Sequence, residues 1–236
     1  MEKIILLNEL LRVYACGASL IRPSVVLTAA HCVHNKDPKT LMIRAGAWNT
    51  QSNDESLPFV EVDVESVIIH KDFGSKSGYN DVALLFLKTP LTKENHINTV
   101  CLPPQDMEFD NASCFVNGWG QENSGSKYSE VLKKVEFPIL SHDNCESRLR
   151  KTRLGERFSL HYSFICGGGE KGADMCKGDG GGALVCPIDG HDGYYYQAGI
   201  VSWGISCGAG NPGVYVKVSQ FRNWIDNQIA EKYSAL

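Results

Sequence analysis

The sequence lacks the features that mark membrane proteins, nucleic-acid-binding proteins and zinc proteins. None of its 236 residues fall in an apolar run long enough to span a membrane. Its net charge is -4, without the basic excess that nucleic-acid partners require. Its nine cysteines form no C-x-x-C pair, so the pattern favours disulfides over zinc ligation as the role of these cysteines. We therefore expect no membrane span, no nucleic-acid partner and no bound metal.

A convincing signal peptide is also missing. The apolar stretch after Met1 ends at Leu7, which is too short for the hydrophobic region of such a peptide. Nine cysteines nevertheless indicate disulfides and an oxidising compartment. A glycosylation sequon begins at Asn111 and agrees with secretion, although such triplets also arise by chance. The sequence therefore predicts a secreted, extracellular protein with a truncated N-terminus.

Strand patterns dominate the chain, and helical patterns are few. Ser141 opens a polar helical stretch to Leu149, and Ser219 is a candidate cap for a terminal helix. There is no internal repeat and no low-complexity linker. Many short strands predict an all-β barrel or sandwich. Strands are expected at residues 24–28, 60–69, 82–87, 131–140, 197–203 and 213–218.

Three short segments carry the candidate chemistry. They are Thr28-Ala29-Ala30-His31-Cys32, Asn80-Asp81-Val82-Ala83 and Gly178-Asp179-Gly180-Gly181-Gly182. Each has an ordinary structural explanation alone, but in this order they resemble the chymotrypsin/trypsin family of serine proteases. The resemblance implies a trypsin-like double six-stranded β-barrel with a C-terminal helix. As a single domain over residues 1–236, it would divide into halves at 1–105 and 106–218 and a helix at 219–232.

The family's mechanism needs a nucleophile, a base and an orienting acid. A serine hydroxyl attacks the carbonyl, a histidine takes its proton and a buried aspartate orients the histidine. The resemblance assigns the base to His31, the acid to Asp81 and the nucleophile position to Gly180, which has no side-chain oxygen. Ala183 also replaces the usual proline. We therefore expect a pseudo-protease that cannot form an acyl-enzyme.

Other parts of the site are retained by resemblance. The backbone N–H groups of Gly178 and Gly180 would form an oxyanion hole. Asp174, with Gly204 and Gly213, would make a pocket for a basic side chain. An unoccupied leftover pocket is the alternative.

The family pattern implies four disulfides and leaves one cysteine over. The implied pairs are Cys16–Cys32, Cys114–Cys186, Cys145–Cys166 and Cys176–Cys207. Cys101 remains, and its counterpart in multidomain members bonds to an N-terminal light chain. We expect that bond here, to an N-terminal clip or light-chain region missing from the sequence. A free thiol or an intermolecular bridge is the alternative.

A histidine and an aspartate kept beside a glycine at the nucleophile position resemble the arthropod clip-domain serine protease homologues. This group includes prophenoloxidase-activating factor II and masquerade-like proteins. The resemblance implies a secreted cofactor protein that assists an active cascade protease or prophenoloxidase in melanisation and innate immunity. Two alternatives stay open: an active trypsin-like endopeptidase in which Gly180 is an artefact or an engineered change, and an adhesion or structural module.

Two further features stay open. One is a basic cluster that would bind an acidic partner or form a solvated loop, made of Arg148, Arg150, Lys151, Arg153 and Arg157. The other is Asn53-Asp54-Glu55, in a loop where some family members bind calcium. We expect no cofactor, with calcium as the alternative.

Overall fold

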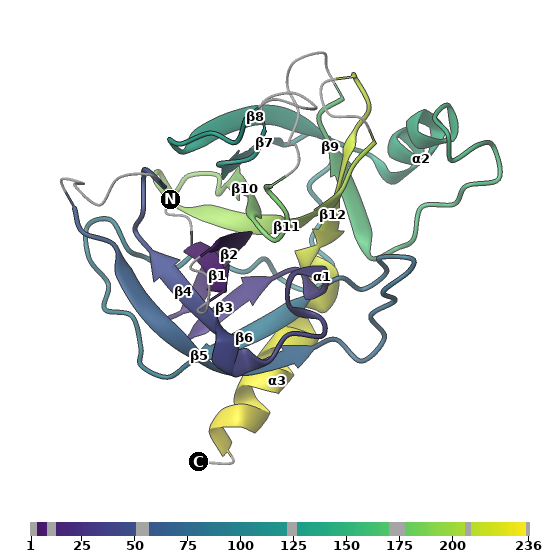
Figure 1. Ribbon diagram of the computed structural model, residues 1–236. Coiled ribbons are helices and arrows are strands. Elements are labelled where there is room, and N and C mark those ends of the chain that lie inside the picture. Colours follow the sequence, from purple (N-terminus) through teal and green to yellow (C-terminus); the bar gives the residue numbers. More distant parts are fainter. Residues whose placement is uncertain are drawn as a thin grey trace.

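Two closed β-barrels make up the fold in the computed structural model (Figure 1). The structure describes residues 4–8, 13–50, 57–121, 127–169, 178–205 and 209–234. Each barrel has six antiparallel strands, and a helix follows the last strand. The predicted double barrel with a C-terminal helix is therefore confirmed.

The first barrel has the strand order β1-β2-β3-β6-β5-β4. Its strand β5 shows why the sequence alternates, since Val62 and Val64 are buried while Glu65 is exposed. β3 and β6 are buried along their whole length, and apart from Thr28 at the end of β3 their residues are all apolar. The strands are β1 (Ile4–Asn8), β2 (Val13–Arg22), β3 (Val25–Thr28), β4 (Leu41–Ala45), β5 (Val60–Ile69) and β6 (Ala83–Leu87).

The second barrel repeats this architecture in the order β10-β11-β12-β9-β8-β7. Its core contains fully buried residues such as Leu184, Ala198 and Tyr215. The strands are β7 (Ser113–Gly118), β8 (Lys133–Leu140), β9 (Phe164–Gly167), β10 (Ala183–Pro187), β11 (Tyr195–Trp203) and β12 (Gly213–Lys217). The six predicted strand ranges differ from these and from the first-barrel strands by at most two residues at their ends.

The helices are short except at the C-terminus. They are α1 (Ala30–Val33), the 3-10 turn η1 (Pro38–Thr40), α2 (His142–Arg150), the 3-10 turn η2 (Val218–Phe221) and α3 (Arg222–Ser234). In Figure 1, α3 leaves the second barrel and runs beneath the first, where the hydroxyl groups of Tyr233 and Ser24 form a hydrogen bond. No helix in the described ranges is long and apolar enough to cross a bilayer.

The prediction that Ser219 caps the terminal helix is wrong. Ser219 lies inside η2, is fully buried, and its hydroxyl has no hydrogen-bond partner among the described residues. Its carbonyl accepts from the Asp106 N–H at 3.1 Å, which ties the turn to the segment between the barrels. The helix starts at Arg222, whose guanidinium donates to the carbonyls of Leu102 and Pro103. Tertiary contacts, rather than a capping hydroxyl, thus set this helix start.

The structure contains three of the four implied disulfides. These are Cys16–Cys32, Cys114–Cys186 and Cys145–Cys166. Cys176 and Cys207 lie outside the described residues. Cys101 is partly buried and forms no disulfide within the described part of the chain. The barrels meet where the Gly17 N–H on β2 donates to the Gly180 carbonyl at 2.8 Å, and this junction positions the site.

Candidate functional site

His31 and Asp81 lie side by side, although 50 residues separate them in sequence. His31 is on α1, directly after β3, and Asp81 ends the turn before β6. Nδ1 of His31 lies 2.7 Å from Oδ2 of Asp81, and the His31 backbone N–H donates to Oδ1 at 2.7 Å. Because an ionised carboxylate only accepts, Nδ1 carries the proton and Nε2 presents its lone pair.

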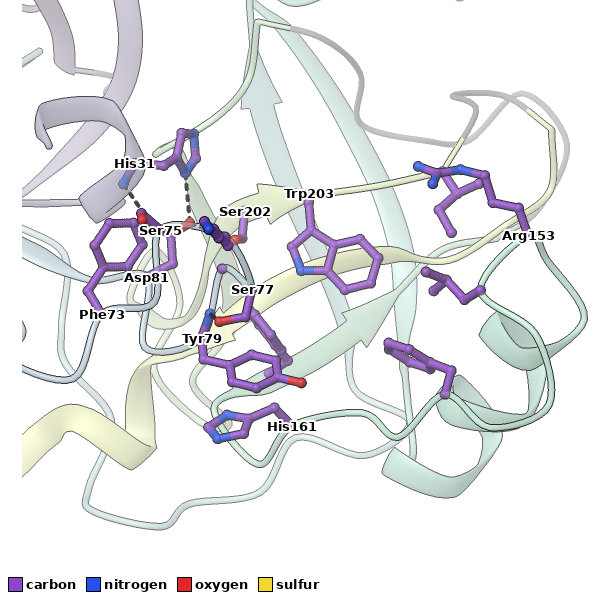
Figure 2. Close-up of a pocket in the computed structure, with 16 residues that line it drawn as sticks. His31, Phe73, Ser75, Ser77, Tyr79, Asp81, Arg153, His161, Ser202 and Trp203 are labelled. Carbon is purple, nitrogen blue, oxygen red and sulfur yellow. Dashed lines mark hydrogen bonds and ion pairs between the residues drawn. The ribbon is translucent and has the colours of Figure 1, made fainter.

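A third donor completes the surroundings of Asp81. Ser202 on β11 donates its hydroxyl to Oδ2 at 2.7 Å. Asp81 is 1% exposed, whereas the His31 side chain is 41% exposed. The turn is fixed by Asn80, which has a φ of 54° and donates its amide to the Asp72 carbonyl. The carboxylate is thus a buried, fully bonded anchor for an accessible imidazole (Figure 2).

We predict that Asp81→Asn lowers the free energy of unfolding by roughly 2–3 kcal/mol, because hydrogen bonds to a charged acceptor are lost and an amide N–H₂ faces existing donors. Chemical denaturation at neutral pH measures the change. Asp189→Asn, at an exposed position, is the control and should stay within about 0.5 kcal/mol. Equal losses in both variants would contradict a structural role for this carboxylate.

Gly180 lies directly in front of Nε2 of His31. A Cβ atom built on Gly180 would be 3.0 Å from Nε2 of His31 and 3.8 Å from Sγ of Cys16. Two backbone hydrogen bonds hold the loop: the Gly180 carbonyl accepts from the Gly17 N–H, and the Gly181 N–H donates to the Val201 carbonyl. Any side chain at position 180 would therefore point at the imidazole.

The backbone explains some glycines of this loop but not Gly180. Gly178 has a φ of 105° and Gly181 a φ of 78°, in the left-handed region that favours glycine. Gly180 is outside that region, so residues with a side chain can adopt its conformation. The missing side chain at position 180 is therefore not a requirement of the fold.

Asp179 and Tyr14 support the same loop from behind. Asp179 is 8% exposed and accepts from the Gly120 N–H at 3.0 Å. The Tyr14 hydroxyl donates to the Gly178 carbonyl. Burial, together with the nearby Asp179 charge, raises the pKa of Tyr14, which keeps it a neutral donor. No sequence motif marks Tyr14, because its hydrogen-bond partner is 164 residues away.

A pocket of about 410 Å³ extends from His31 and Asp81. Its size is within the roughly 300–1,000 Å³ typical of ligand sites. In Figure 2, Trp203 stands in the middle, with His31 on one side and Arg153 on the other. No sequence motif marks this pocket, since its rings come from separate segments. Besides His31, the ring-bearing residues that line the pocket are Phe73, Tyr79, Phe158, His161, Phe164 and Trp203.

The basic cluster does not form one free surface. Arg148 points inward and donates to the carbonyls of Gly168, Gly169 and Gly210. Arg150 pairs with Glu146 and donates to a backbone carbonyl. The structure therefore uses two of the five basic residues to hold loops together. Lys151, Arg153 and Arg157 are exposed.

The remaining candidate binding and glycosylation residues fall into two groups: some lie outside the described ranges, and the others have a defined place in the fold. Asp174 and the candidate calcium segment at 53–55 are outside them. Gly204 is exposed just after β11, and Gly213 is buried at the start of β12. Asn111 is exposed.

Cys16, His31 and Cys32 offer atoms that lie within 4.8 Å of one another, the one such group of metal-ligand types found in the described part of the chain. The two sulfur atoms are bonded to each other. They are therefore not the thiolates that a zinc ion would need.

Comparisons with known proteins agree with this geometry. The family model described as Trypsin matches residues 7–225. The chain is 49% identical to phenoloxidase-activating factor 2 of Galleria mellonella, over 94% of this chain and 74% of that protein. It is 42% identical to the inactive CLIP domain-containing serine protease A8 of Anopheles gambiae, over 94% of this chain and 61% of that protein. For A8 and for the related A28, at 41% identity, the chain spans less than two thirds of the relative's length.

Proposed function

Because this chain belongs to the trypsin family, and within it to the clip-domain serine protease homologues, we propose that it binds partner proteins without cleaving them. The observation that carries the proposal is the position of Gly180 in front of Nε2 of His31, where no oxygen can be activated. In another serine protease, loss of the nucleophile alone costs about a million-fold in turnover. His31 and Asp81 then serve as remnants of the triad that hold the cleft together.

The rest of the cleft supports a binding role. In the proposal, the N–H groups of Gly178 and Gly180 form the oxyanion hole, and Asp174 with Gly204 and Gly213 receives a basic side chain. The pocket beside Trp203, about 410 Å³, adds a second contact area. A polypeptide segment would thus dock as a substrate does but leave intact.

The proposed setting is a secreted cascade that activates prophenoloxidase. Support comes from the relative named phenoloxidase-activating factor 2 and from three disulfides, which favour an oxidising compartment. The proposed partners are an active cascade protease or prophenoloxidase. In the same proposal, Cys101 bonds to an N-terminal region of the full-length protein, and Asn111 carries a glycan.

The test is reconstitution of the cascade. An activating protease and prophenoloxidase are combined with and without this protein, and phenoloxidase activity is measured. We expect phenoloxidase activity to rise when this protein is added. The rise should be the same when the protein has first been treated with a fluorophosphonate and the excess reagent removed. Loss of the effect after that treatment would point to an active endopeptidase, and no effect in either arm would contradict the cascade role.

A further inference from the structure

We propose that the pocket beside His31 holds a partner segment in which an apolar or aromatic side chain lies next to an acidic one. This inference rests on the proposed function, because it names the chemistry of the partner that the cleft binds. Two features carry it: the aromatic interior of the pocket and the positive side chains at its rim.

The interior of the pocket is built from rings. Trp203 packs edge-to-face with Phe158 and Phe164, at centroid distances of 6.3 and 5.9 Å. Tyr79 stacks on His161 at 4.0 Å, with an angle of 9° between the rings (Figure 2). An apolar or aromatic side chain is stabilised there both by loss of apolar area from water and by ring contacts.

The rim of the pocket is positive. Lys76 and Arg153 line it, both are exposed, and neither forms an ion pair with any residue that the structure describes. Asp81 is the one carboxylate among the described lining residues, and it is buried and bonded to His31 and Ser202. Among the lining residues that the structure describes, the two positive side chains at the rim therefore have no free carboxylate to match them.

The arrangement of these groups sets the order of the partner's side chains. Figure 2 shows Arg153 on the far side of Trp203 from His31. An apolar side chain over Trp203 thus leaves an acidic one that pairs with Arg153 at the end of the pocket away from His31. An extended segment advances about 3.3 Å per residue, so side chains one or two positions apart reach both parts of one pocket.

The test compares three labelled pentapeptides on the native protein by fluorescence anisotropy. They are Gly-Asp-Phe-Asp-Gly, Gly-Asn-Phe-Asn-Gly and Gly-Asp-Ala-Asp-Gly, which carry acid on both sides and so do not assume a chain direction. We expect the first to bind about three- to fivefold more tightly than the second at low salt. We expect it to bind at least about tenfold more tightly than the third. The preference for acid should fade at about 0.5 M salt.

Two matched variants locate the effect. Arg153→Gln should remove most of the preference for Asp over Asn, and Arg157→Gln, exposed on the same loop but outside the pocket lining, should retain it. Equal binding of the three peptides, binding of none, or the same loss in both variants would overturn the inference. None of these results bears on whether the protein reacts covalently, so failure here is distinct from failure of the proposed function.

Discussion

Gly180→Ser is expected to make the protein react with a fluorophosphonate, whereas Gly180→Ala is not. The backbone at position 180 is open to residues with a side chain, and a Cβ there lies 3.0 Å from Nε2 of His31. After a shift of a few tenths of an ångström in the ring, a serine hydroxyl would be within reach of the base. The alanine variant has the same Cβ contact without the oxygen, so it isolates the nucleophile.

The gain should be large and should depend on the base. The nucleophile is worth about a million-fold in another serine protease, and members of a triad act as a unit. We therefore expect labelling of Gly180→Ser to exceed that of Gly180→Ala by at least about a thousandfold, and addition of His31→Ala to remove most of the gain. Rates of labelling are followed by mass spectrometry. Labelling of the serine variant that persists without His31 would contradict the assigned role of the imidazole.

Replacing both Cys114 and Cys186 with alanine is expected to lower the free energy of unfolding by about 4 kcal/mol. The disulfide joins β7 to β10, and 72 residues separate its ends, so its loss frees a long loop in the unfolded chain. Both cysteines are buried, so the substitution also leaves a small cavity in the second barrel.

Chemical denaturation of the double variant under non-reducing conditions measures this loss. Cys101→Ala is the control, because Cys101 has no disulfide within the described residues, and it should change stability by less than about 1 kcal/mol. If the double variant unfolded at the same denaturant concentration as the native protein, a structural role for this disulfide would be contradicted.

Local motifs carry the part of the site that the sequence predicts. His31, Asp81 and Gly180 each stand in a short segment that can be read alone, and their order in the chain identifies the family. Strand ranges such as 60–69 follow from alternation that reflects one buried face. The double barrel itself rested on the family resemblance, since periodicity alone allowed a barrel or a sandwich.

Contacts between distant segments account for what the sequence did not show. Tyr14 and Gly178 meet only because the two barrels pack together, and the aromatic pocket brings two separate loops and β9 together with β11. Arg148 looked like part of a basic surface, but the fold turns its guanidinium onto backbone carbonyls. Ser219 looked like a helix cap, but its turn is buried and its carbonyl accepts from the Asp106 N–H in the segment between the barrels.

The most direct test of the account is the intact mass of the native protein after exposure to a fluorophosphonate and, separately, to an activated arginyl ester. With only hydrogen on the α-carbon of Gly180, both treatments should leave the mass unchanged, while an active trypsin-like protease run in parallel gains the adduct. A stoichiometric phosphonyl or acyl adduct on the native chain would contradict the claim that its protease fold binds without reacting.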